Sequence, residues 1–212
     1  MEAKSLNKKY GGTLWTHKQA TKINYEAKAQ NYNVILLATH SFALNEDPEH
    51  SFIAFSEKDD KKEDELMVVS EVYSQVINAD LVVLSSCESA KGKLLRGEGL
   101  MNIAQAFFRS GARSIVAALW NVSDEQAPKI IETYFENLDK GSNKSKALQI
   151  AQTSYFETSI GLKSHPFYWA GFNSFHNDDA IQFSSQTSIY IWGLGLLIII
   201  LLGFVGKKLL QA

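Results

Sequence analysis

The sequence predicts a mixed α/β domain built around a mostly parallel β-sheet. Two short apolar runs, residues 33–40 and 80–87, have the length and composition of strands that are buried on both faces. A third apolar run, residues 114–119, follows a helical segment that Gly111 ends as a typical C-terminal cap. A strand that reaches the next strand through a helix runs parallel to it, so these runs predict a parallel sheet.

The remaining elements follow from hydrophobic spacing and from turn residues. In chain order we expect a helix over residues 15–29, a short strand over 52–55, a short helix over 68–76, a helix opened by Gly97 and Gly99 that ends near Arg109, helices over 123–138 and 144–156, and a final strand over 168–175. In the first of these helices, Ala20, Ile23 and Ala27 are predicted to form the inner face.

Composition excludes several classes of protein. A formal net charge of −2 and an isoelectric point near 6.2 give no electrostatic reason to expect a nucleic-acid partner. Cys87 is the single cysteine, so no disulfide forms within one chain. The histidines show no metal-ligand spacing, and we expect neither a metal site nor an organic cofactor. The polar residues 1–10 lack the apolar core of a signal peptide.

The C-terminal tail has a different composition from the rest of the chain. Residues 180–206 carry no charge, and the almost wholly apolar run 189–205 is followed at once by two lysines. Its 17 residues fall at the short end of the spanning range of roughly 17–25 residues. Tyr190 and Trp192 lie where interfacial aromatics are expected. We therefore expect a single transmembrane helix over residues 188–206, with a buried core helix as the alternative.

Two reactive side chains follow the first two predicted strands. His40 ends one run and Cys87 ends the other. Parallel sheets place their chemistry at the carboxyl ends of the strands, so neighbouring strands would bring the imidazole and the thiol together. A thiol with a pKa of about 8.5 is mostly protonated at pH 7, and an adjacent imidazole can activate it. The alternatives are a small buried cysteine and a hydrogen-bonded structural histidine.

Six segments of the chain, in order, resemble the CHAT family, a branch of the caspase-like cysteine peptidases that also includes separase. The segments are Leu36-Leu-Ala-Thr-His40, Ala79-Asp-Leu-Val-Val-Leu-Ser-Ser-Cys-Glu-Ser89, Gly97-Glu-Gly99, Gly111-Ala-Arg-Ser-Ile-Val116, Leu119-Trp-Asn-Val-Ser-Asp124 and His165-Pro-Phe-Tyr-Trp-Ala170. Together they cover roughly residues 11–178.

The resemblance implies a caspase-like three-layer α/β/α sandwich with His40 as the base and Cys87 as the nucleophile. The backbone N–H groups of Ser41 and Cys87 would form the oxyanion hole. Family members usually have glycine where this chain has Ser41, and serine adopts positive φ less readily than glycine. Asp124 would contact a basic substrate side chain before the scissile bond; the alternative is a carboxylate in the first turn of a helix.

These observations lead to two functional hypotheses. The first is a membrane-anchored caspase-like cysteine endopeptidase that uses a Cys–His dyad. The second is a catalytically inactive CHAT-like interaction or signalling module tethered to the membrane. The expected organisation is a CHAT domain over residues 1–178, partial at its N-terminus, a linker over 179–187, the transmembrane helix, and a basic tail over 207–212.

The expected partners follow from the same hypotheses. They are a protein or peptide substrate, the lipid bilayer, and a helical-repeat partner or a further N-terminal region. The localisation is a single-pass membrane protein, with the side of the membrane that holds the domain left open.

Overall fold

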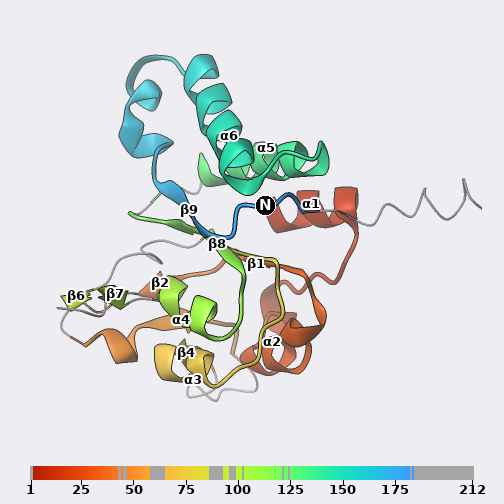
Figure 1. Ribbon diagram of the computed structural model, residues 1–212, viewed down its shortest axis with the longest axis vertical. Helices are drawn as coiled ribbons and strands as arrows, with labels where there is room; N and C mark the ends of the chain where they lie inside the picture. Colours follow the sequence, from red (N-terminus) through yellow and green to blue (C-terminus); the bar gives the residue numbers. More distant parts are fainter. Residues whose placement is uncertain are drawn as a thin grey trace, which may run out of the picture. The chain divides into compact units, whose positions relative to one another are not determined.

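A four-stranded sheet forms the centre of the domain in the computed structural model (Figure 1). Its strand order is β1 (Val34–Leu37), β5 (Leu81–Leu84), β8 (Ser114–Ala118) and β9 (Phe172–His176). The strands β1, β5 and β8 are mutually parallel, and β9 pairs with β8 in the antiparallel direction. The prediction of a mixed α/β fold with a mostly parallel sheet is thereby confirmed.

The structure describes residues 2–42, 44, 47–57, 65–85, 93–95, 99–101, 103–120, 122–123, 125–181 and 183. One compact unit spans Met1–Ile181. Within the described residues, no helix combines the length and the apolarity that crossing a membrane requires. The predicted transmembrane segment, residues 188–206, lies outside the described residues.

Six α-helices and five 3₁₀ turns occur within the described part of the chain. The helices are α1 (Glu2–Tyr10), α2 (Lys22–Lys28), α3 (Val69–Tyr73), α4 (Ile103–Arg109), α5 (Ala127–Asp139) and α6 (Lys144–Thr158). The 3₁₀ turns are η1 (His17–Gln19), η2 (Ala29–Asn31), η3 (Pro48–His50), η5 (Gly161–Ser164) and η6 (Pro166–Tyr168). Within the Met1–Ile181 unit, α1, α5 and α6 lie on one side of the central sheet, and α2, α3 and α4 lie on the other (Figure 1).

The burial of the central strands explains this layering. Every residue of β5 and β8 is buried, which requires cover on both faces of the sheet. Alternate residues of the strands join one core with the helices of the α2–α4 side; they are Ile35, Leu37, Val82, Leu84, Ile115 and Ala117. Because side chains alternate along a strand, the intervening residues face the layer that contains α5 and α6.

Two smaller β structures accompany the central sheet. One is a three-stranded antiparallel sheet of β2 (Ser41–Phe42), β3 (Phe52–Ala54) and β4 (Leu66–Val68). The other is a pair formed by β6 (Lys93–Leu95) and β7 (Gly99–Met101). The first sheet begins directly after His40, so it determines how the chain leaves the end of β1.

The predicted helix over residues 15–29 is wrong in its start and in its inner face. The Thr21 hydroxyl accepts a hydrogen bond from the backbone N–H of Asn24 at 3.3 Å, so α2 begins only at Lys22. The side chain of Ile23 is 46% exposed, whereas Tyr25 and Ala29 are buried. The inward face therefore differs from the predicted stripe because the Thr21 cap sets the helix start.

Two further boundaries differ from the prediction. Gly99 lies in β7, and α4 begins only at Ile103, so the two glycines do not open that helix. The final strand begins at Phe172, because Pro166 starts the 3₁₀ turn η6. The His165 Nδ1 atom accepts the backbone N–H of Phe167 at 3.2 Å and caps this turn.

A buried lysine connects α6 to the segment after β9. The side chain of Lys144 is fully buried, and its Nζ donates to the backbone oxygen of Asp179 at 2.7 Å and to Asn177 Oδ1 at 3.2 Å. Burial lowers the pKa of Lys144, while the charges of Asp80, Asp179 and Asp178 act in the opposite direction. The lysine thus joins the two segments through hydrogen bonds despite the cost of desolvating its charge.

Candidate functional site

The strands that precede His40 and Cys87 are parallel neighbours. β1 pairs with β5 in register from Val34 opposite Leu81 to Leu37 opposite Leu84. The backbone N–H of Ser85 donates to the Leu37 oxygen at 3.0 Å, which extends the ladder past the end of β5. The carboxyl ends of both strands therefore meet at one edge of the sheet, as the dyad hypothesis requires.

His40 stands at this edge with its backbone fixed and its side chain exposed. The His40 oxygen accepts the backbone N–H of Ala54 at 2.8 Å. The preceding Thr39 hydroxyl donates to the Ala54 oxygen at 2.5 Å. Strand β3 thus holds the chain on either side of the imidazole, while the ring itself is accessible to solvent. An accessible imidazole with a fixed backbone suits a general base.

Ser41 fits its position in extended conformation. It is the first residue of β2, it pairs with Ile53, and it is only 3% exposed. Among the non-glycine residues that the structure describes, only His17 and His176 have positive φ. Serine in place of the usual family glycine therefore causes no left-handed strain here.

The hydrogen-bond pattern also orients the Ser41 amide. Ala54 donates to the oxygen of His40, so His40 and Ala54 form a hydrogen-bonded pair of the antiparallel ladder. Hydrogen-bonded and non-hydrogen-bonded pairs alternate, which directs the Ser41 N–H away from β3.

Two of the predicted site residues, Cys87 and Asp124, lie outside the described residues. Ser85 is the last described residue before Cys87, and Asp124 falls between the described Ser123 and Glu125. The Ser123 oxygen accepts the backbone N–H of Gln126 at 2.9 Å and of Ala127 at 3.0 Å, so it leads directly into α5. The roles of Cys87 and Asp124 remain predictions.

The segment after β8 packs against the aromatic segment before β9. The Trp120 Nε1–H donates to the Phe167 oxygen at 2.8 Å, and the two rings stack with their centroids 6.4 Å apart. Gly171 leaves room for this packing, because a Cβ built there would lie 2.5 Å from Val122 Cγ2 and 3.2 Å from Trp120 Nε1. Two of the segments that carry the family resemblance thus support each other at the sheet edge that also holds the ends of β1 and β5.

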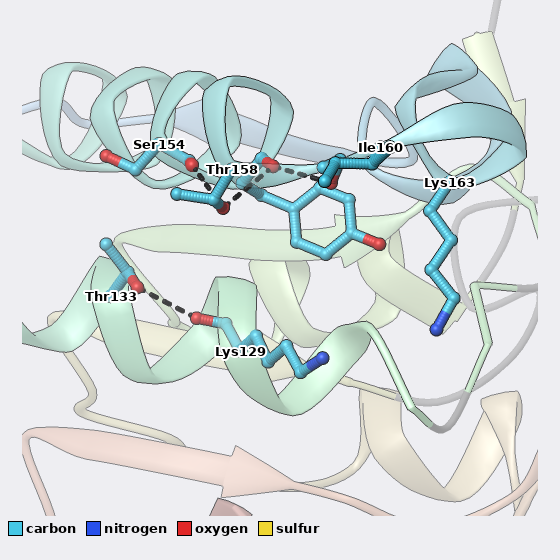
Figure 2. Close-up of a pocket in the computed structure, with 8 residues that line it drawn as sticks. Lys129, Thr133, Ser154, Thr158, Ile160 and Lys163 are labelled. Carbon is cyan, nitrogen blue, oxygen red and sulfur yellow. Dashed lines mark hydrogen bonds between the residues drawn. The ribbon is translucent and has the colours of Figure 1, made fainter.

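A pocket of about 440 Å³ lies on the helical layer, between α5 and the C-terminal end of α6 (Figure 2). Figure 2 shows Lys129 and Thr133 on one side of it and Ser154 and Thr158 on the other. None of the predicted site residues lines this pocket. Lys163, which lines the pocket, donates a hydrogen bond from Nζ to Glu125 Oε1 at 2.5 Å. This hydrogen bond is the main reason that the pKa of Glu125 is lowered. We assign no chemistry to this pocket.

Sequence reasoning missed one residue at the sheet edge. Glu2 of α1 is only 6% exposed, and its Oε1 accepts a hydrogen bond from the Ser85 hydroxyl. These residues are 83 positions apart in the chain. The polar segment before Tyr10 gave no signal that it packs against the sheet, because only Glu2 and Leu6 of α1 are buried.

Taken together, these features define an α/β domain with a solvent-accessible histidine at the edge of a mostly parallel sheet. The CHAT domain family matches residues 2–177. The chain belongs to this caspase-like family.

Two tetratricopeptide repeat proteins resemble part of the chain. Tetratricopeptide repeat protein 28 of Mus musculus is 27% identical over 128 residues, which cover 58% of this chain and 5% of that protein. The protein of the same name from Homo sapiens is 27% identical over 124 residues, with the same two coverages. The chain thus matches only a small part of these long relatives.

Proposed function

We propose that this chain is a caspase-like cysteine endopeptidase domain in which His40 activates Cys87. The observation that carries the proposal is the in-register parallel pairing of β1 with β5, extended by the bond from Ser85 to Leu37. The segments that contain His40 and Cys87 therefore leave the sheet from adjacent strands. Family membership and helices on both sides of the sheet support the finer proposal of a caspase-like three-layer sandwich.

The proposed reaction proceeds through a thioester. His40 takes the proton of the Cys87 thiol, and the sulfur attacks the carbonyl carbon of the scissile peptide bond. The protonated His40 then gives its proton to the leaving amine as the C–N bond breaks. His40 then takes a proton from water, the resulting hydroxide attacks the thioester carbonyl, and the C–S bond breaks as His40 gives that proton to the sulfur. The original thiol proton thus ends on the amine product and a proton from water replaces it on Cys87, so the cycle needs no cofactor.

The oxyanion of each tetrahedral intermediate would accept hydrogen bonds from the backbone N–H groups of Ser41 and Cys87. The extended conformation of Ser41 and the direction of its N–H away from β3 support this role. Asp124 is proposed to bind a basic side chain of the substrate, because its carboxylate belongs to the segment that follows β8. An ion pair of this kind would select lysine or arginine before the cleaved bond.

The proposal predicts peptide hydrolysis that depends on Cys87. The full chain is incubated with a panel of peptides that differ at the residue before the scissile bond, and the products are separated by mass. We expect cleavage after basic residues, no cleavage by Cys87→Ala, and loss of the basic preference in Asp124→Asn. Cleavage that persists in Cys87→Ala would overturn the assignment.

The second candidate is a non-catalytic interaction module, and an exposed apolar surface favours it. Large apolar side chains near the end of α6 and in the following turns are exposed; they are Phe156, Ile160, Leu162 and Phe167. Apolar surface of this kind often marks a protein interface. The names of the relatives denote tetratricopeptide repeats, so a helical-repeat partner is the corresponding proposal. If the chain has this function, Cys87→Ala should bind the partner as tightly as the native chain does.

We further propose that residues 188–206 anchor the domain in a lipid bilayer. A lysine in the centre of a spanning helix costs about 2.5–3.5 kcal/mol on insertion scales. The full chain should therefore stay in the membrane fraction after alkaline carbonate extraction, and Ile199→Lys should weaken this retention. Ile160→Lys is the matched control, because Ile160 is 89% exposed on the described domain. Recovery of the native chain in the soluble fraction would contradict the anchor.

A further inference from the structure

A buried carboxylate outside the proposed dyad contacts the end of the strand that leads to Cys87. Glu2 lies in the first turn of α1 and is only 6% exposed. Its Oε1 accepts a hydrogen bond from the Ser85 hydroxyl. Burying a carboxylate costs desolvation free energy, so carboxylates are rarely buried unless hydrogen bonds to polar partners offset that cost. The contact with Ser85 therefore has a structural or functional role.

Ser85 is held from two directions. Its backbone N–H donates to the Leu37 oxygen of β1 at 3.0 Å, and its side chain donates to Glu2 of α1. The first bond fixes Ser85 to the strand that leads to His40. The second fixes it to a helix of the neighbouring layer. Together they fix the position and direction of the chain two residues before Cys87.

The helix that carries Glu2 is itself anchored along its length. Leu6 is buried. At the far end Lys9 Nζ also lies 2.9 Å from Glu136 Oε1 of α5, but both side chains are about half exposed and a surface ion pair of this kind adds little to the anchoring. The Tyr10 ring packs on Phe135 with the centroids 6.2 Å apart. Because α5 belongs to the packed core, α1 provides a rigid support for the Glu2 carboxylate.

We propose that Glu2 is a positioning residue for Cys87, acting through the hydroxyl of Ser85. This inference rests on the proposed function, because it assumes that Cys87 must stay beside His40. Glu2 contributes by restricting how the chain enters the Cys87 segment. When this hydrogen bond is lost, the sulfur spends less time within reach of the imidazole, and the thiolate loses part of its stabilisation.

The test measures the reactivity of the thiol rather than peptide turnover. Cys87 is the single cysteine of the chain, so iodoacetamide alkylation of the full chain in mild detergent reports on this sulfur alone. The alkylation rate is measured from pH 5 to pH 10 to give an apparent thiol pKa. In Glu2→Ala and in Ser85→Ala we expect this pKa to rise by about one unit toward 8.5, with a fall of up to about tenfold in rate at pH 6.

Two matched variants separate the hydrogen bond from charge and from general loosening of α1. Glu2→Gln keeps an oxygen acceptor for Ser85 and should restore the native profile. Lys9→Ala removes the exposed ion pair at the other end of α1 and should leave the profile unchanged. The double variant Glu2→Ala/Ser85→Ala should shift the pKa no further than either single variant, because both remove the same interaction.

The outcomes distinguish this inference from the proposed function. An unchanged profile in both Glu2→Ala and Ser85→Ala, in a chain where His40→Ala raises the thiol pKa, would overturn the role of Glu2 and retain the dyad. Equal effects of Glu2→Gln and Glu2→Ala would show that the charge acts, and would also overturn it. An unchanged profile in His40→Ala would instead refute the dyad. Should Glu2→Ala fail to fold, Ser85→Ala decides the question.

Discussion

Replacing His40 with alanine is expected to lower peptide hydrolysis by about 10²–10⁴-fold, the usual contribution of a positioned general acid–base group. Without the imidazole, the thiol must lose its proton unaided, with a pKa near 8.5. The residual activity of His40→Ala should therefore increase as pH rises toward 9, whereas the native chain should reach its plateau at lower pH. Initial rates on a cleaved peptide, measured between pH 5 and pH 10, test both statements.

His50 provides the matched control for this experiment. It is another exposed histidine of the same region, and its Nδ1 lies 2.7 Å from Asp47 Oδ2. This hydrogen bond raises the pKa of His50. His50→Ala should retain the native rate and the native pH profile. If His50→Ala lost hydrolysis while His40→Ala kept it, the general base would be His50, and our assignment of His40 would be wrong.

The second large effect concerns folding. Gly111→Ala should lower the free energy of unfolding by about 2–4 kcal/mol, because two penalties combine at this site. Gly111 has φ +109°, and a Cβ built there would lie 2.4 Å from the backbone oxygen of Ile77. The Ile77 backbone cannot easily move away from the added Cβ, because its N–H donates a hydrogen bond to the Ser110 oxygen at 2.8 Å. Urea denaturation followed by circular dichroism gives the change in stability.

Gly141→Ala separates the two penalties. Gly141 also has positive φ, +84°, but no atom lies within 4 Å of a Cβ built there. It should lose only the conformational part, about 1 kcal/mol. Equal losses of stability in the two variants would show that the contact with Ile77 is unimportant.

The central strands could be predicted because buried parallel strands appear in a sequence as continuous apolar runs. The ranges of β1, β5 and β8 follow directly from the runs that contain Ile35, Val83 and Val116. Their parallel direction followed from the helical crossover, and the structure confirms it. These features depend on composition over several residues, so an error of one position does not change them.

The helix starts were less predictable because single hydrogen bonds determine them. One hydroxyl, that of Thr21, delays α2, and the pairing of Gly99 in β7 delays α4. The pattern of apolar residues alone suggested a longer first helix with Ile23 inside. Tertiary packing buries Tyr25 instead.

For the candidate site, the ends of the two apolar runs pointed to His40 and Cys87, and the family resemblance supplied the roles of Ser41 and Asp124. The structure describes His40 and Ser41 at the sheet edge, whereas Cys87 and Asp124 lie outside the described residues. The contact between Glu2 and Ser85 could not be predicted, because neither position carries a motif and the chain folds across 83 positions to make it. Long-range contacts of isolated polar residues leave no periodic signal in a sequence.

The most direct test of the account is the distance between the Cys87 sulfur and the nearest ring nitrogen of His40 in a crystal structure with a peptide inhibitor bound covalently at Cys87. We expect these atoms to lie within about 4 Å of each other, close enough for proton transfer once the thiol is free. A sulfur and an imidazole that face different sides of the sheet, with no position from which the ring reaches the sulfur, would contradict the proposed peptidase.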